Sequence, residues 1–414
     1  MIVSRWPAVL TVVAAVALTG GCSEPESSRP EAQVIDSAGL RVVSYDLTEV
    51  DAPVYRRVGD PDLQIGVVDG APEYSFSRIV DVELVNDSLV VVSDAVSREV
   101  RVFDVQGRYQ RSIGQQGEGP GELVTAPSIV GISGDTLFVY DPGGGRLSSF
   151  TVDGQFLATL TVSSSTGNRI SELTRRADGS YLAQSRWVAP DQTLVLHDIR
   201  LELDSVVIER LTADGVLVDT MAVMADRNRA RMVQDGGGGR VSVIQAQPPY
   251  TARTFVRAAG SGVVIGRSAS FELELGQGGG PSTLLRVLGV DHPATSAEIR
   301  SRQEARMREA MGERPLDPRT RQLNLDYLPE RLPAFAEVTL SGDGDVWVAV
   351  TEFDSSNGYD RLVFSSAGEL RGLVHTPPDM RLMVVRPGYI IGVVTDELDV
   401  PYVRRYPLIA PGAD

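Results

Sequence analysis

Four acidic side chains are placed where they could meet and bind a ligand or a metal ion. Asp94 and Asp141 each end a short apolar run, and Glu352 and Asp396 stand at comparable places later in the chain. If these positions converge on one mouth of a common channel, their carboxylate oxygens would suit Ca²⁺ or Mg²⁺. An aspartate that ends a strand also accepts backbone hydrogen bonds in turns. We favour this structural role, because no regular metal-ligand spacing connects the four. No cofactor is then expected, and Ca²⁺ is the alternative to test.

The other reactive residue types give little sign of catalysis. All 39 basic residues are arginine, which excludes a Walker-type phosphate loop and a catalytic lysine. His197, His292 and His375 lie in unlike settings and form no recognisable metal or Ser-His-Asp pattern. The glycine-rich segment 117–121 contains Pro120 and opens no helix, so we interpret it as a turn between strands. Catalytic residues therefore stay unassigned.

Charge and cysteine content narrow the class of protein. The 414 residues carry a formal net charge of −16, with 42% hydrophobic residues, which is an ordinary globular composition. A strongly acidic chain disfavours nucleic acid as a partner, because phosphate contacts need a positive surface. The single cysteine excludes an intrachain disulfide and a multi-cysteine zinc site.

The first 22 residues have the order of an export signal. Arg5 precedes an apolar run over residues 8–18, which is too short to span a bilayer, and small residues then lead to Cys22. This order resembles the signal of bacterial lipoproteins, in which the cysteine is acylated and becomes the new N-terminus. The resemblance implies a signal peptide over 1–21 and lipidation of Cys22. An ordinary secretory signal is the alternative.

The segment that follows is expected to link an anchor to a folded domain. Residues 22–32 are rich in Ser, Pro and Glu, which cannot bury apolar surface, and we expect a flexible tether. Ser23 stands where an aspartate would resemble an inner-membrane retention signal, so the outer membrane is favoured. We therefore expect a cell-envelope protein that touches the membrane through its lipid anchor only.

The elements that must position these residues are short strands in a repeat. Four strand-like segments separated by turns fall within residues 77–114, and the same order returns over 128–162. Looser copies begin near Arg169 and Arg231, and a clear one covers 336–375. Four strands every 40 to 50 residues are typical of a β-propeller.

The last unit needs a strand from elsewhere. Residues 380–408 supply three strands of a sixth unit, whereas 34–47 form a spare strand before the first unit. We predict that this N-terminal strand completes the sixth unit and closes the ring, which leaves only short, protected edges.

A helical insertion interrupts the repeat over residues 293–331. Thr295 and Glu298 have the spacing of a capping box, and good helix formers continue from Ser296 to Met311 before Gly312. The insertion, helical near 294–313, is either a surface decoration or a cap over one end of the channel, and we favour the decoration.

One string of residues resembles a known family. Residues 113–123, with the element Gly119-Pro120-Gly121-Glu122, lead from the first unit to the second. They look like the repeat of NHL-like six-bladed β-propellers, which occur as exported lipoproteins in bacteria. The resemblance covers about residues 33–410 and implies fold and export, but no reaction. A carboxylate cluster at the channel mouth would resemble metal-dependent lactonases of the gluconolactonase type.

The sequence thus predicts an all-β, six-bladed β-propeller of four-stranded blades over 33–410. We expect a monomeric, non-enzymatic binding module for a small molecule, a peptide or an envelope protein. The alternative is a Ca²⁺- or Mg²⁺-dependent hydrolase or lactonase with its site at the channel mouth. A structural role in an envelope assembly is a third hypothesis.

Overall fold

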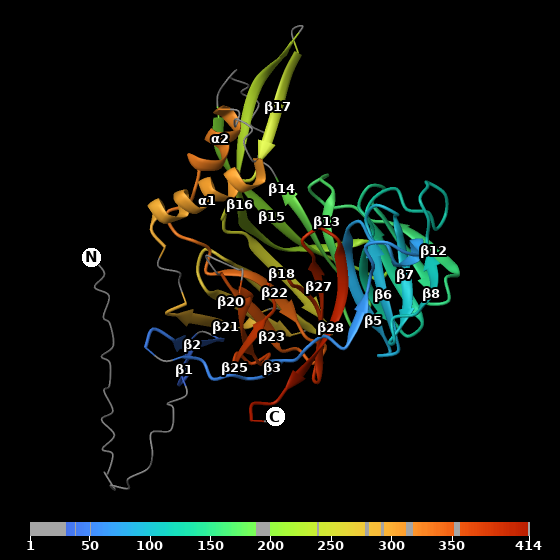
Figure 1. Ribbon diagram of the computed structural model, residues 1–414, viewed down its shortest axis with the longest axis horizontal. Helices are drawn as coiled ribbons and strands as arrows, with labels where there is room; N and C mark the ends of the chain where they lie inside the picture. Colours follow the sequence, from blue (N-terminus) through green and yellow to red (C-terminus); the bar gives the residue numbers. More distant parts are fainter. Residues whose placement is uncertain are drawn as a thin grey trace, which may run out of the picture.

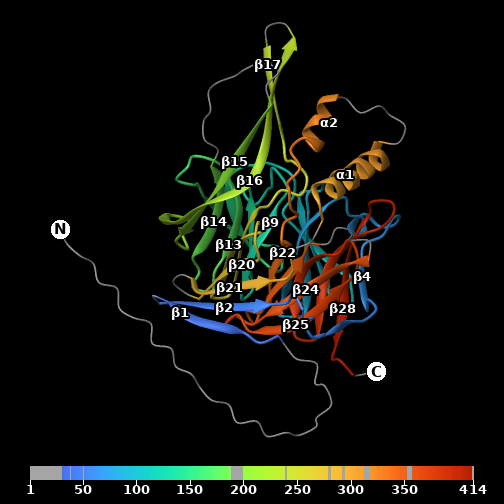
Figure 2. The ribbon, with the colours of Figure 1, turned by 90° about the vertical axis from the view of Figure 1, so that its left-hand side faces the viewer.

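The structure, a computed structural model, consists mainly of β-strands in six separate sheets (Figures 1 and 2). It describes residues 30–37, 39–49, 51–187, 199–237, 240–277, 281–290, 294–311, 318–351 and 357–412. Within each sheet, strands that follow one another directly in the chain pair antiparallel, and most sheets follow the order of the chain. This pattern is that of propeller blades.

The first two blades have the strands that the sequence repeat predicts. Blade one holds β5 (Ile79–Val85), β6 (Leu89–Asp94), β7 (Glu99–Asp104) and β8 (Tyr109–Ile113). Blade two holds β9 (Ser128–Ser133), β10 (Thr136–Asp141), β11 (Arg146–Thr151) and β12 (Phe156–Thr161). Their apolar faces pack on each other through side chains such as Val91, Val102 and Val139, which are fully buried. Radial packing therefore buries the faces that a single blade would expose.

Blade three is longer than the sequence predicts. It holds β13 (Ile170–Arg175), β14 (Tyr181–Trp187), β15 (Ile199–Leu211), β16 (Leu217–Gly237) and β17 (Arg240–Ala246). The hairpin of β16 and β17 projects from the body of the propeller (Figures 1 and 2). The prediction that a fourth unit begins near Arg231 was wrong, because Arg231 lies in β16 and pairs with Gln245 of β17.

Blades four and five follow the hairpin. Blade four holds β18 (Thr254–Ala259), β19 (Gly262–Arg267), β20 (Glu272–Gln277) and β21 (Pro281–Leu288). Blade five holds β22 (Phe335–Leu340), β23 (Val346–Val350), β24 (Tyr359–Phe364) and β25 (Leu370–Thr376). Phe255, Phe271 and Phe335 pack together where the two blades meet, with ring centroids 5.3 and 5.5 Å apart.

Blade six closes the ring with N-terminal residues, but not with the predicted ones. It holds β26 (Arg381–Arg386), β27 (Tyr389–Thr395) and β28 (Pro401–Ile409), and β3 (Arg57–Val58) and β4 (Leu63–Ile65) pair with β28. The predicted closing segment, 34–47, instead forms β1 (Gln33–Ser37) and β2 (Leu40–Asp46). There β2 runs parallel to β21 and extends blade four. A short 3-10 helix, Pro72–Tyr74, then leads to blade one.

The first strands of the blades form the inner ring of the propeller. Each contacts the first strand of both neighbouring blades, in the order β5, β9, β13, β18, β22 and β26 and back to β5. Successive side chains of a strand point to opposite sides, so every second residue of an inner strand faces the central axis. The residues on that side form the candidate site.

The predicted helix is present, with a second one after it. Helix α1 (Ser296–Met311) begins at the capping box, in which the Thr295 amide donates to Glu298 Oε2 at 2.7 Å. Helix α2 (Pro318–Leu325) packs Leu323 against Ala230 of β16, beside the projecting hairpin (Figure 1). The residues that line the central channel and the side pocket described below include none from α1 or α2.

Candidate functional site

Asp94 ends β6 as predicted, but its carboxylate accepts hydrogen bonds from neighbouring loop residues. Its side chain is 2% exposed, Oδ1 accepts the Arg78 amide at 2.9 Å, and Oδ2 accepts the Ser97 hydroxyl at 3.0 Å. These bonds fasten the start of β5 to the turn after β6. Asp94 therefore stands one strand outward from the channel.

Asp141 has the same place in blade two and a similar role. Its oxygens accept the Val124 amide at 2.6 Å, the Thr125 hydroxyl at 2.6 Å and the Gly143 amide at 3.0 Å. Burial by itself would raise the pKa of Asp141, but these hydrogen bonds outweigh it and lower the pKa below its ordinary value. Asp141 thus helps hold the connection between the first two blades.

The other two predicted carboxylates are not brought to the same place. Asp396 accepts the Val400 amide and the Tyr402 hydroxyl, and the Tyr402 bond is the largest cause of its lowered pKa. Glu352 lies outside the described residues. No group of three or more His, Cys, Asp or Glu side chains in the described part of the chain could hold a metal ion. A ligand-binding role for the four remains a prediction.

Segment 117–121 and His375 also make contacts within the protein. Segment 117–121 lies between β8 and β9, where the Gly119 amide donates to Glu122 at 2.8 Å and Leu123 enters the core. It is an interblade turn, as predicted. His375 lies on β25 with Nδ1 2.8 Å from Asp360 of β24. His197 and His292 lie outside the described residues.

The central channel is a cavity to which all six inner strands contribute. It has a volume of about 460 Å³. Its charged lining residues are Asp81 and Glu83 of β5, Glu172 of β13, Arg257 of β18, Glu337 of β22 and Arg381 of β26. Ser128 and Ile129 of β9 complete the ring.

Two of these acidic groups are neutralised by arginine. Arg257 Nη1 lies 2.9 Å from Glu172 Oε1, and Arg257 Nε donates to the Val338 carbonyl at 3.1 Å. Glu337 Oε2 lies 2.6 Å from Nη1 of Arg361, whose side chain is only 1% exposed. These ion pairs connect blade three to blade four and hold β22 to β24. In each pair one carboxylate oxygen faces the guanidinium.

Asp81 and Glu83 differ from these two acids because neither forms an ion pair with a described residue. Asp81 accepts the Ile129 amide at 3.0 Å, and the acceptor bond of Glu83 is a long one of 3.3 Å from the Leu84 amide. Solvent still reaches both half-buried side chains along the channel, although protein surrounds them. Burial raises the pKa of Asp81 to about 6 and that of Glu83 to about 7, against the smaller effects of a backbone hydrogen bond and of a nearby arginine.

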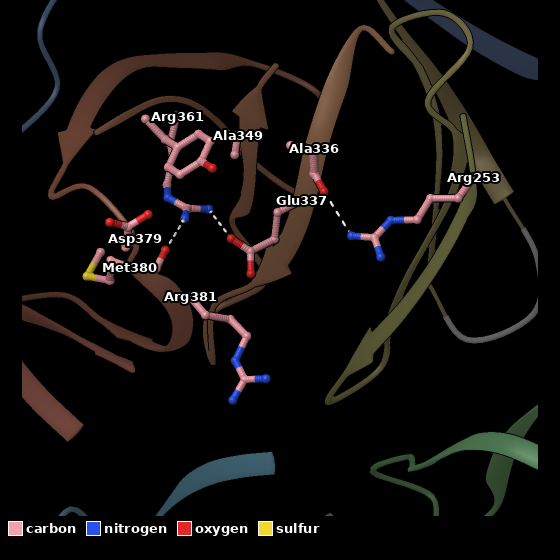
Figure 3. Close-up of a pocket in the computed structure, with 9 residues that line it drawn as sticks. Arg253, Ala336, Glu337, Ala349, Arg361, Asp379, Met380 and Arg381 are labelled. Carbon is pink, nitrogen blue, oxygen red and sulfur yellow. Dashed lines mark hydrogen bonds and ion pairs between the residues drawn. The ribbon is translucent and has the colours of Figure 1, made fainter. Parts of the chain in front are cut away.

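A side pocket of about 280 Å³ adjoins the channel between blades four, five and six (Figure 3). It shares Glu337 and Arg381 with the channel. Its other lining residues are Arg253, Ala336, Ala349, Tyr359, Arg361, Asp379 and Met380. The channel and the side pocket therefore lie next to each other.

The sequence reasoning missed these channel residues. The signal was the alternation Asp81-Val82-Glu83-Leu84, in which Val82 and Leu84 are buried in the core on the other side of β5. In an ordinary two-sided strand such polar positions face solvent. They become channel residues only because β5 is the innermost strand of its blade.

Comparison with known proteins agrees with the architecture. Residues 71–187 match a family model described as a 6-bladed beta-propeller. The crystal structure of a Bacteroides fragilis protein assigned as exported superposes with a TM-score of 0.51 at 11% identity, covering 89% of this chain and 99% of the other. A DUF4221-family protein of Bacteroides vulgatus gives a TM-score of 0.43 at 10% identity, covering 85% and 98%.

Together the fold and the family-model match define the class of protein, a six-bladed β-propeller. Because the sequence identities are only 10 and 11%, the superpositions show a shared fold and nothing about function. No curated protein matches the chain significantly in sequence. Among the described residues, no helix is long and apolar enough to cross a membrane.

Proposed function

We propose that this protein is an exported, lipid-anchored binding module that takes a small, positively charged group into its central channel. The observation that carries the proposal is the pair Asp81 and Glu83, which line the channel and keep acceptors that no described donor fills. A guanidinium or ammonium group supplies several N–H donors and the opposite charge. Export and anchoring rest on the signal-like segment that ends at Cys22.

The raised pKa values of the two acids fit this proposal. A carboxylate that the protein surrounds without a full counter-charge is destabilised, and a bound cation relieves that cost. Binding should therefore be strongest above about pH 7, where both groups are ionised. It should weaken as the pH falls toward 5, because protonation removes the charge that attracts the ligand.

The metal-dependent hydrolase has less support. The oxygens of Asp94, Asp141 and Asp396 already accept hydrogen bonds within turns. A carboxylate held by backbone amides has few lone pairs left for a cation.

Agmatine, which carries a guanidinium and an ammonium group, is a suitable first probe. We expect agmatine to raise the melting temperature of the purified full chain at pH 7.5, and to do so less at pH 5. Asp81→Asn and Glu83→Gln should each reduce the shift, and the double variant should abolish it. Glu118→Gln, on an exposed turn, is the matched control. An undiminished shift in the double variant would place the ligand elsewhere.

A further inference from the structure

The central channel and the side pocket differ in the character of their walls. The accessible surface of the channel wall is mostly polar, whereas that of the side pocket is mostly apolar. The two cavities lie next to each other and share Glu337 and Arg381. Two adjoining cavities of opposite character fit a ligand that has a charged end and an apolar end.

The apolar wall of the side pocket is unexpected from the residue types alone. Five of the nine lining residues are charged, namely Arg253, Glu337, Arg361, Asp379 and Arg381. A long charged side chain can cover apolar surface with its methylene stem while its charged end lies elsewhere. The positions of the charged ends therefore decide what the pocket can bind.

Arg361 and Glu337 neutralise each other within blade five. The register places Ala349 directly between them, paired with Glu337 on one side and with Arg361 on the other. Because the Ala349 side chain is a single methyl group, the ion pair closes over it, with Nη1 of Arg361 2.6 Å from Oε2 of Glu337 (Figure 3). These two residues therefore add no net charge to the pocket.

The other two arginines use their guanidinium groups at the edges of the pocket. Arg253 donates through Nη2 to the Ala336 carbonyl at 3.0 Å and lies over the Phe255 ring at 4.4 Å (Figure 3). Arg381 donates to the Ile79 carbonyl in the channel, and Figure 3 shows its guanidinium turned away from the other labelled side chains. Asp379 is exposed to solvent. The interior of the pocket is left to apolar groups.

The interior has the size and the chemistry to hold a ring. Its apolar lining residues are Tyr359, Met380, Ala336 and Ala349, of which Met380 and Ala349 are buried. The pocket has a volume of about 280 Å³, and a cavity of about 150 Å³ is enough to bind benzene. Aromatic and thioether side chains make favourable contacts with a further ring.

Arg381 gives the distance between the two cavities. It lines the side pocket, and its guanidinium reaches the Ile79 carbonyl on β5, two residues before Asp81. Its charge is one of the smaller effects that offset burial in the pKa of Asp81. Asp81 therefore lies within about the length of one arginine side chain from the pocket. A linker of roughly three carbon atoms covers most of that length.

We propose that the side pocket is an apolar subsite of the channel and that the ligand is a hydrophobic amine. Its ammonium group lies at Asp81 and Glu83, and its ring or branched alkyl group lies against Tyr359 and Met380. The charged end of this ligand rests on the proposed function, whereas the apolar end rests on the pocket alone. Burying a ring in this pocket adds affinity that the acids of the channel do not supply.

3-Phenylpropylamine and propylamine are a matched pair of probes, because they differ only in the phenyl ring. Titration calorimetry on the full chain at pH 7.5 should show 3-phenylpropylamine binding about tenfold or more tightly. Ala336→Leu, which fills the pocket, should remove most of this difference, and Tyr359→Ala should reduce it. Ala213→Leu, on an exposed turn of blade three, is the control and should leave the difference unchanged. Thermal unfolding of each variant checks that it folds.

The double variant Asp81→Asn/Glu83→Gln tests the charged end. It should weaken both amines by a similar factor, because the ring still enters the pocket. Equal affinities of the two amines for the natural chain would overturn the apolar subsite, and binding of agmatine would still support the channel proposal.

A neutral probe tests the side pocket without the channel acids. If neither the amines nor agmatine bind, benzyl alcohol is titrated instead. Binding of benzyl alcohol that Ala336→Leu abolishes would support the apolar subsite and overturn the cation site. Failure of all four probes to bind would overturn both proposals.

Discussion

Glu83 is the residue at which the channel most directly affects stability. Its pKa is raised by burial from 4.5 to about 7, so the folded chain holds this proton more tightly than the unfolded chain does. The stability contributed by the neutral acid is complete below about pH 4.5 and is lost as the pH rises through 7. A shift of this size corresponds to about 3 kcal/mol at most, and water in the channel reduces it to roughly 1–2 kcal/mol.

Glu83→Gln should therefore stabilise the ligand-free protein at high pH only. We expect a gain of about 1–2 kcal/mol in the free energy of unfolding at pH 8, and almost none at pH 4.5, where both side chains are neutral. Urea unfolding at the two pH values measures the difference, with Glu118→Gln as an exposed control. A loss of stability at pH 8 would show that Glu83 makes a favourable ionic contact instead.

The two kinds of acidic residue show how far chemistry can be predicted from sequence. Asp94 and Asp141 attracted attention because they end apolar runs, and the structural alternative considered for them matches their bonds in turns. Asp81 and Glu83 stand within a run and look like an ordinary solvent-facing pattern. Their environment depends on the closing of six blades around one axis, which no local pattern encodes.

At the scale of elements, the ring is closed by a short segment that the sequence does not single out. Strands β3 and β4 hold only two and three residues, far below the length that a strand pattern needs. Arg405 binds Asp62, just before β4, at 2.7 and 3.2 Å, and Arg404 donates to Gln64 of β4 at 2.8 Å. In segment 34–47 apolar and polar residues alternate over a longer stretch, a pattern that would suit an edge strand in any blade. In the structure this segment pairs with blade four.

Blade three shows the same limit on prediction. Arg229 pairs with Glu202 and with Asp204 at 3.0 Å each, across β15 and β16. In sequence these residues are merely charged and favour no strand. Once the strands pair, the opposite charges face each other and stabilise the pairing of β15 with β16, a strand of 21 residues. The four-strand repeat of blades one, two and five was predictable because its signals are local.

Ile65 tests which N-terminal segment closes the propeller. Its side chain is fully buried between blades six and one, so Ile65→Ala should cost about 2–5 kcal/mol. Ile35 of β1 is 60% exposed and provides the same substitution in the segment that was first predicted to close the ring. Ile35→Ala should cost less than about 0.5 kcal/mol. Chemical unfolding of both variants measures the contrast, and the reverse order would contradict closure by β4.

At the scale of the whole molecule, the charge and the proposed anchor act in opposite directions. A chain with a formal net charge of −16 is repelled by anionic lipid, so its surface should not adsorb to a membrane unaided. The described chain enters blade four through β1, at the end of the molecule opposite the β16–β17 hairpin (Figures 1 and 2).

Cys22→Ser should therefore release the protein from membranes almost completely, because no second membrane contact is proposed. The expected result is a shift from the membrane pellet to the soluble envelope fraction, with loss of incorporated labelled fatty acid. Ser23→Ala, one residue further on, should stay in the pellet. The melting temperature of the released protein should equal that of the anchored form, since residue 22 precedes β1. Unchanged pelleting of Cys22→Ser would refute lipid anchoring, while the proposal for the channel would be unaffected.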